Sequence, residues 1–160
     1  MKSLLCVAFH FPPSESIAAI RMRGYAKYLP EQGWDPTFLC PVLDGREGSP
    51  HNLIETPYRG DVGSRLAAWV LGSKPESALA AGVSHVAWAR GSSRFLVAGG
   101  RLIRRLAAIP DPRRNWRVDA TRVGQEILRN TEYDAILSSG PPWTAHLIAR
   151  NLAASFDIPW

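Results

Sequence analysis

Two short polar segments of the chain contain residue types that bind anions and sugars. The first spans residues 9–16, reads FHFPPSES, and is followed by Arg21. The second spans residues 138–146 and reads SSGPPWTAH. Hydroxyl, imidazole and guanidinium groups form hydrogen bonds with sugar hydroxyls and phosphate oxygens. These two segments are therefore the candidate binding loops of the chain.

The first candidate loop leads into a predicted helix. Ser16 is suited to cap that helix, because a serine hydroxyl accepts a hydrogen bond from a first-turn backbone amide. Free amides at a helix N-terminus can hold an anion or a sugar hydroxyl, and Arg21 lies about one turn further on, within reach of a phosphate. The alternative is a tight proline turn, with the guanidinium solvated or paired to a local acid. As a binding site, this loop would use His10, Pro13, Ser14, Ser16 and Arg21.

The second candidate loop also leads into a predicted helix, with Pro142 in its first turn. His146 lies one turn inside this helix, so its ring can point toward the loop and form a hydrogen bond with a sugar. A lone histidine on a helix can equally have a structural role. As a binding site, this loop would use Ser139, Gly140 and His146.

Hydrophobic runs place both loops at the ends of predicted strands. Residues 4–9 form an unbroken apolar run, which is typical of a parallel strand buried on both faces. Further strands are predicted at 35–40, 53–56, 133–139 and from 158, and helices at 17–29, 116–129 and 142–156. This alternation predicts an α/β fold, a Rossmann-like parallel sheet with helices on both faces. In such folds ligands bind at the carboxyl ends of the strands, where both loops would lie.

Positive charge is concentrated in one part of the chain. The net charge is +5, and residues 90–117 contain eight arginines and a single acid. Within this region the apolar residues recur at helical spacing, which predicts an amphipathic helix carrying Arg94, Arg101, Arg104 and Arg105. Such a helix can lie on an anionic membrane, or it can pack on the sheet with its arginines in water. Nucleic acid is not an expected partner, because aromatic residues are not interleaved with the basic ones.

Several classes of site lack their sequence signatures. No G-x-x-x-x-G-K-[ST] motif occurs, and no G-x-G-x-x-G follows the first strand. Neither zinc-ligand spacing nor a G-x-S-x-G motif is present, so no metal site is predicted. Cys6 and Cys40 fall in predicted core strands and are expected to be buried and reduced. No apolar stretch approaches the about 20 residues of a membrane span, so we expect a cytoplasmic protein. Peripheral contact at the inner face of the cell membrane is expected only if the arginine-rich helix lies on the membrane and not on the sheet.

The two loops and their flanking residues, in their order and spacing, resemble the N-terminal domain of family 4 glycosyltransferases of the GT-B fold. The similarity is to the sub-group that assembles cell-surface polysaccharides. Its first part comprises residues 9–13, Arg21, residues 26–29, Gly33, Trp34 and residues 37–39. Its second part comprises Pro110, Asp111, Trp116, residues 133–142, His146 and residues 158–160. Residues 42–108 match poorly, and Ser14, Glu15 and Ser16 stand where the family often has glycines.

The resemblance implies transfer of a sugar from a nucleotide donor to a hydroxyl of a lipid-linked or polysaccharide acceptor. It also implies retention of anomeric configuration and no catalytic metal. The first loop and Arg21 would line an interdomain cleft, and Ser139, Gly140 and His146 would contact the acceptor or the transferred sugar.

The family's nucleotide-sugar site lies mostly in a C-terminal domain that residues 1–160 do not contain. The resemblance therefore implies that these residues are one half of a GT-B architecture, which a further domain or a partner subunit completes. We expect this chain by itself to bind no cofactor and to be inactive, with the nucleotide-sugar donor bound in the full-length protein. The rival interpretation is a stand-alone, non-catalytic module that binds a sugar, a membrane or a partner.

Overall fold

The computed structural model describes residues 1–42, 52–58, 60 and 111–160. Internal contacts divide the chain into two compact units, one formed by Met1–Tyr58 with Trp116–Trp160 and the other by Arg59–Asn115. The second unit is described only at residues 60 and 111–115. The predicted amphipathic helix with Arg94, Arg101, Arg104 and Arg105 therefore lies outside the described residues.

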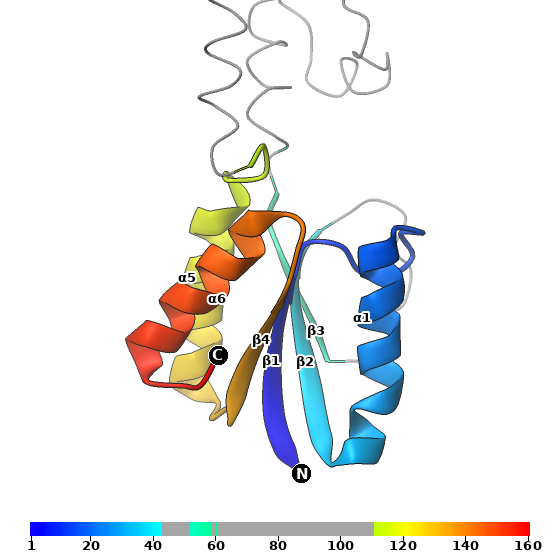
Figure 1. Ribbon diagram of the computed structural model, residues 1–160. Helices are drawn as coiled ribbons and strands as arrows, with labels where there is room; N and C mark the ends of the chain where they lie inside the picture. The colour runs from blue at the N-terminus through cyan, green and yellow to red at the C-terminus, as the bar shows by residue number, and fades with distance from the viewer. Residues whose placement is uncertain (43–51, 59, 61–110) are drawn as a thin grey trace, which may run out of the picture. The chain divides into compact units, whose positions relative to one another are not determined.

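The first unit is built on a sheet of four parallel strands (Figure 1). The strands are β1 (Lys2–Ala8), β2 (Trp34–Pro41), β3 (Leu53–Thr56) and β4 (Ala135–Ser139), and their order in the sheet is β3-β2-β1-β4. β1 is an inner strand, and its residues from Leu4 onward are buried, as its continuous apolar run predicts. The predicted α/β fold with a parallel sheet is confirmed.

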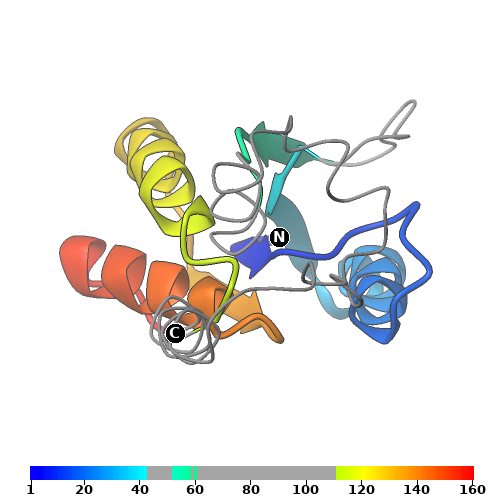
Figure 2. The same cartoon turned by 90° about the horizontal axis from the view of Figure 1, so that it is seen from above.

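Helices cover both faces of this sheet (Figures 1 and 2). The helices are α1 (Ile17–Tyr28), on one face, and α5 (Trp116–Asn130) and α6 (Trp143–Phe156), on the other. Successive strand residues point to opposite faces, so β1 supplies both cores. The core on the α1 side contains Leu4, Cys6, Ala8, Phe11, Met22, Ala26, Phe38 and Cys40. The core on the other side includes Leu5, Val7, Phe9, Leu39, Trp116, Ala120, Ile136, Ile148 and Leu152.

Local signals set the ends of α1. The Ser16 hydroxyl accepts a hydrogen bond of 3.2 Å from the backbone amide of Ala19, which confirms the predicted cap. The helix ends at Tyr28, two residues before Pro30; Leu29 still has helical φ and ψ, of −61° and −37°, but Pro30 has no amide proton with which to continue the helical hydrogen bonds. A short 3-10 helix, η1 (Pro30–Gln32), then leads to Gly33, whose φ of 80° suits glycine.

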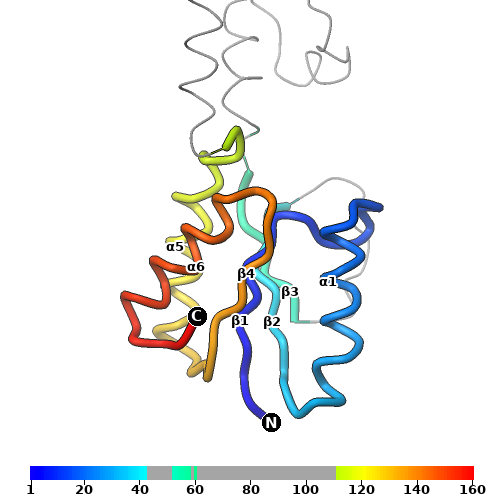
Figure 3. The backbone as a smooth tube through the Cα atoms, in the orientation of Figure 1, coloured from blue at the N-terminus to red at the C-terminus, as the bar shows by residue number. Residues whose placement is uncertain are grey.

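Two sequence predictions differ from the structure. Pro142 is the residue before α6 rather than part of its first turn. Residues 158–160 are not a strand, although the Ile136 amide donates a hydrogen bond of 2.8 Å to the Pro159 carbonyl and joins this segment to the outer edge of β4 (Figure 3). Pro159 has no amide proton, so the backbone ladder cannot continue through it.

Both cysteines are buried free thiols, as predicted. Burial disfavours the charged thiolate and raises the pKa of Cys6 to about 12. Among the described residues, no helix combines the length and hydrophobicity that crossing a membrane requires.

Candidate functional site

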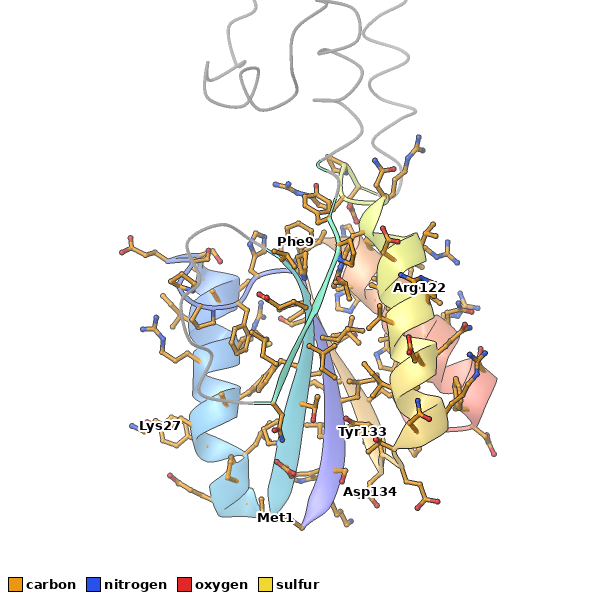
Figure 4. All side chains as sticks on the ribbon, turned by 180° about the vertical axis from the view of Figure 1, so that it is seen from behind. Met1, Phe9, Lys27, Arg122, Tyr133 and Asp134 are labelled. Atoms are coloured by element: carbon orange, nitrogen blue, oxygen red, sulfur yellow. The ribbon has the colours of Figure 1, made fainter. Side chains whose placement is uncertain are left out.

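The two candidate loops leave the sheet at the same end, the one formed by the carboxyl ends of the strands and called the carboxyl edge below. β1 and β4 are parallel neighbours, with Ala8 beside Ser139, so the segments that follow them start next to each other. Figure 4 shows Phe9, the first residue of the first loop, at this edge and Met1 at the opposite edge. The fold thus brings together two segments that are far apart in sequence, at the position where α/β proteins bind ligands.

A hydrogen bond from Arg21 joins α1 to the second loop. Nη2 of Arg21 donates to the carbonyl oxygen of Gly140 at a distance of 3.0 Å, across 119 positions of the sequence. The Arg21 side chain is exposed and makes no other hydrogen bond within the described part of the chain. A guanidinium carries five N–H donors, so most of its donors remain available to a ligand. Neither sequence interpretation of Arg21, a phosphate ligand or a solvated side chain, included this backbone contact.

His146 is held in place by two further side chains. Nδ1 of His146 lies 2.8 Å from the Ser138 hydroxyl, and the indole Nε1 of Trp160 donates to the same hydroxyl at 2.8 Å. The other ring nitrogen, Nε2, lies against Gly140, where a Cβ atom would collide with it. Residue 140 must therefore be a glycine for the ring to take this position.

The sequence did not single out Ser138 or Trp160 as site residues. Ser138 is beside Val7, whose side chain packs on the α5 and α6 side of the sheet, so strand alternation directs the Ser138 hydroxyl toward α6. The direction of the Ser138 side chain could therefore have been predicted from strand alternation. The contact of Trp160 depends on the chain returning to β4 after α6, for which the sequence has no local signal.

Trp143 adds an exposed aromatic ring to this group. It is the first residue of α6 and is 64% exposed. Its ring centroid lies 5.7 Å from that of His146, with the two planes inclined by 51°. The second loop thus presents a hydrophobic surface beside a hydrogen-bonding imidazole.

Ser139 lies on the other face of the sheet from His146. Its neighbour Ala8 belongs to the core on the α1 side, whereas Ser138 and His146 interact on the α6 side. Ser139 is 8% exposed, and its hydroxyl has no hydrogen-bond partner in the described part of the chain. The structure therefore brings Gly140 into contact with both Arg21 and His146, but directs Ser139 and His146 to opposite faces. The buried hydroxyl remains a potential donor and acceptor on the Arg21 side.

The polar residues of the first loop interact with one another. The Ser14 hydroxyl donates to that of Ser16 at 3.2 Å and accepts a hydrogen bond from the Ser16 amide at 3.4 Å. Ser16 also caps α1, so both hydroxyls have local partners. Pro13 is exposed, and the His10 ring packs edge-on against Phe9 with their centroids 5.1 Å apart. These contacts give the first loop a defined conformation at the rim of the candidate site.

The described residues contain no cluster of three or more histidine, cysteine, aspartate or glutamate side chains that could hold a metal ion. Comparisons with protein-family models, with curated proteins and with solved structures found no match. The interpretation of the site therefore depends on its geometry and on the chemistry of its residues.

Proposed function

We propose that this chain is the acceptor-side, N-terminal half of a glycosyltransferase that moves a sugar from a nucleotide donor to a lipid-linked or polysaccharide acceptor. The observation that carries the proposal is the hydrogen bond between Arg21 and the Gly140 carbonyl. Arg21 lies in α1, directly after the first loop, and Gly140 lies in the second loop; both belong to the residues that resemble family 4 glycosyltransferases, and the bond ties α1 to the second loop. The surface that they form lies at the carboxyl edge of the parallel sheet, where such folds bind ligands.

The chemistry of the surface suits a sugar acceptor that carries phosphate. The exposed guanidinium of Arg21 can bind phosphate oxygens through its remaining N–H groups. Nε2 of His146 can form a hydrogen bond with a sugar hydroxyl beside Gly140. The exposed ring of Trp143, next to His146, can pack against the apolar face of a sugar ring.

The proposal assigns donor binding to a further domain or a partner subunit. The nucleotide-sugar would be bound there, and the transferred sugar would meet the acceptor at the edge described here. Contact of the protein with an anionic membrane would bring it to a lipid-linked acceptor. The predicted arginine-rich helix would serve that contact.

The test is a transfer assay on the native protein with all of its encoded sequence. Its intact mass is measured first, and a panel of nucleotide-sugars is then offered with a polyprenyl-diphosphate sugar as acceptor. We expect product formation, and we expect Arg21→Ala and His146→Ala to raise the KM for the acceptor about tenfold, as loss of about 1.4 kcal/mol of binding would do. The KM for the donor should change much less.

Arg23→Ala is the matched control, because Arg23 is exposed on the same helix and no contact with the second loop involves it. An unchanged acceptor KM in Arg21→Ala and His146→Ala would show that the acceptor binds elsewhere. Acceptor binding without transfer from any donor would favour the stand-alone sugar-binding module instead.

A further inference from the structure

We infer that Ser138 and Trp160 are positioning residues that hold His146 with its proton on Nε2, so that the ring presents an N–H donor beside Gly140. Only the identity of the ligand rests on the proposed function. The orientation and tautomer of the ring follow from the contacts of the chain itself.

The tautomer follows from an account of donors and acceptors. The indole N–H of Trp160 can only donate, so the Ser138 oxygen accepts at that contact, over 2.8 Å. The Ser138 hydroxyl still has one proton, and its other partner within the described chain is Nδ1 of His146, at 2.8 Å. If Nδ1 accepts this proton, the Trp160 N–H, the Ser138 hydroxyl and Nδ1 all have partners, and Nε2 is without one among the described residues in either tautomer.

The opposite tautomer leaves a group without a partner. A proton on Nδ1 would have to be donated to the Ser138 oxygen, which already accepts from Trp160. The Ser138 proton would then have no acceptor among the described residues. Since a polar group in a partly buried position is disfavoured without a partner, the proton of His146 belongs on Nε2.

Nε2 is the ring atom that faces the candidate site. It lies against Gly140 and forms no hydrogen bond with the described residues, and the Gly140 carbonyl is already occupied by Arg21. An N–H group in this position selects a ligand atom that accepts a hydrogen bond. The group recognised beside Gly140 is therefore an oxygen of a hydroxyl or phosphate, and an ammonium group is excluded.

The experiment is an NMR measurement of the His146 ring in protein labelled with nitrogen-15, without any ligand. Long-range proton–nitrogen correlations, recorded in a buffer alkaline enough to keep the imidazole neutral, show which ring nitrogen carries the proton. We expect a protonated Nε2 and an unprotonated Nδ1 in the unmodified protein. Ser138→Ala should give a mixture of the two tautomers, and Trp160→Phe should shift the ratio in the same direction.

Two variants serve as controls. Ser138→Thr keeps the hydroxyl on a strand residue and should retain the original tautomer. Trp34→Phe changes a tryptophan at the start of β2, where the amino ends of the strands lie. It is therefore far from the loops and should leave the His146 signals unchanged. The Ser138→Thr and Trp34→Phe variants also show whether replacing a serine or a tryptophan changes the His146 signals merely by loosening the fold.

A proton on Nδ1 in the unmodified protein would overturn the inference. So would a Ser138→Ala protein that folds and keeps the original tautomer. If Ser138→Ala does not fold, the unmodified protein, Ser138→Thr and Trp160→Phe still decide the question. The NMR experiment contains no sugar or donor, so its result does not depend on transferase activity. If the protein has the expected tautomer but no transferase activity, the proposed function is refuted and this inference stands.

Discussion

Nη2 of Arg21 lies 3.0 Å from the carbonyl oxygen of Gly140, although 119 positions separate the two residues in the sequence. Arg21 belongs to α1, which packs on one face of the sheet, and Gly140 precedes α6, which packs on the other. A single side chain thus connects the helices of both faces at the carboxyl edge. The conformation of the second loop should therefore depend on Arg21.

Replacing Arg21 by alanine should loosen the second loop without unfolding the protein. The bond is exposed, so we expect the free energy of unfolding to fall by less than about 1 kcal/mol. The backbone amides of Gly140 and Trp143, between which Pro141 and Pro142 carry no amide proton, should exchange with solvent several times faster, measured by hydrogen exchange with NMR detection. Arg23→Ala on the same helix should leave these amides unchanged. Equal exchange in the two variants would show that the bond does not order the loop.

Removing the hydroxyl of Thr56 should destabilise the protein substantially. Thr56 and Trp116 are fully buried, and the Trp116 indole donates to the Thr56 hydroxyl at 2.6 Å, which in turn donates to the Cys40 carbonyl at 3.2 Å. Thr56→Val has nearly the same shape but leaves the indole N–H without its acceptor. We expect a loss of about 1–3 kcal/mol in urea denaturation.

Thr56→Ser is the matched control, because it keeps the hydroxyl and removes only a methyl group. It should cost about 1 kcal/mol, less than the valine variant. A valine variant as stable as the unmodified protein would contradict the structural role of this hydrogen-bonded series.

The fold was predictable because its signals are local. The apolar run of β1, the Ser16 cap and the proline after α1 each act within a few residues, and each prediction is confirmed. The predicted strand at residues 158–160 is not formed: the Ile136 amide donates one hydrogen bond to the Pro159 carbonyl, and Pro159 has no amide proton to donate to β4 in turn.

The candidate site was predictable only in outline. Parallel strands place the two loops at one edge, and this followed from the order of the elements. The contact between Arg21 and Gly140, and that between Trp160 and Ser138, depend on how distant elements pack. The opposite directions of Ser138 and Ser139 follow from strand alternation, but which of them meets His146 depends on the face that α6 covers.

The buried thiol of Cys6 should make the protein less stable at alkaline pH. Burial raises the pKa of Cys6 to about 12, whereas in the unfolded chain the thiol ionises near its ordinary pKa of 9.0. The contribution of the Cys6 thiol to the free energy of unfolding is therefore complete below that ordinary pKa, and it declines as the pH rises toward 12. The expected decline is roughly 1.4 kcal/mol for each pH unit above the ordinary pKa.

The measurement compares the free energy of unfolding between pH 8 and 10.5 with that of Cys6→Ala. The alanine variant starts from a lower stability but should lose less of it over this range, because other ionising groups are common to both proteins. Parallel pH profiles would show that the Cys6 thiol is not protected from ionisation by the fold.

The last prediction concerns the contact between α5 and α6. Gly124 packs so closely on Leu152 that a Cβ atom at residue 124 would lie 2.6 Å from the leucine Cδ1. Leu152 is fully buried, so its side chain has little room to move. Gly124→Ala should therefore be destabilising, because overpacking costs about 1–3 kcal/mol and alanine's better helix propensity returns only about 1 kcal/mol. Gly24→Ala in α1, where a Cβ meets no atom within 4 Å, should instead stabilise the protein by about 0.5–1 kcal/mol.

A double-mutant cycle separates this contact from the other effects of each substitution. Leu152→Ala alone should cost about 2–5 kcal/mol by leaving a cavity in the core. In the Leu152→Ala background, the methyl group that Gly124→Ala introduces no longer collides with the leucine and fills part of the space. The combined variant should therefore be more stable than the sum of the single losses predicts, by at least about 0.5 kcal/mol. Additive losses in urea denaturation would mean that α5 and α6 adjust their spacing around residue 124, and that close packing of the helices does not require a glycine there.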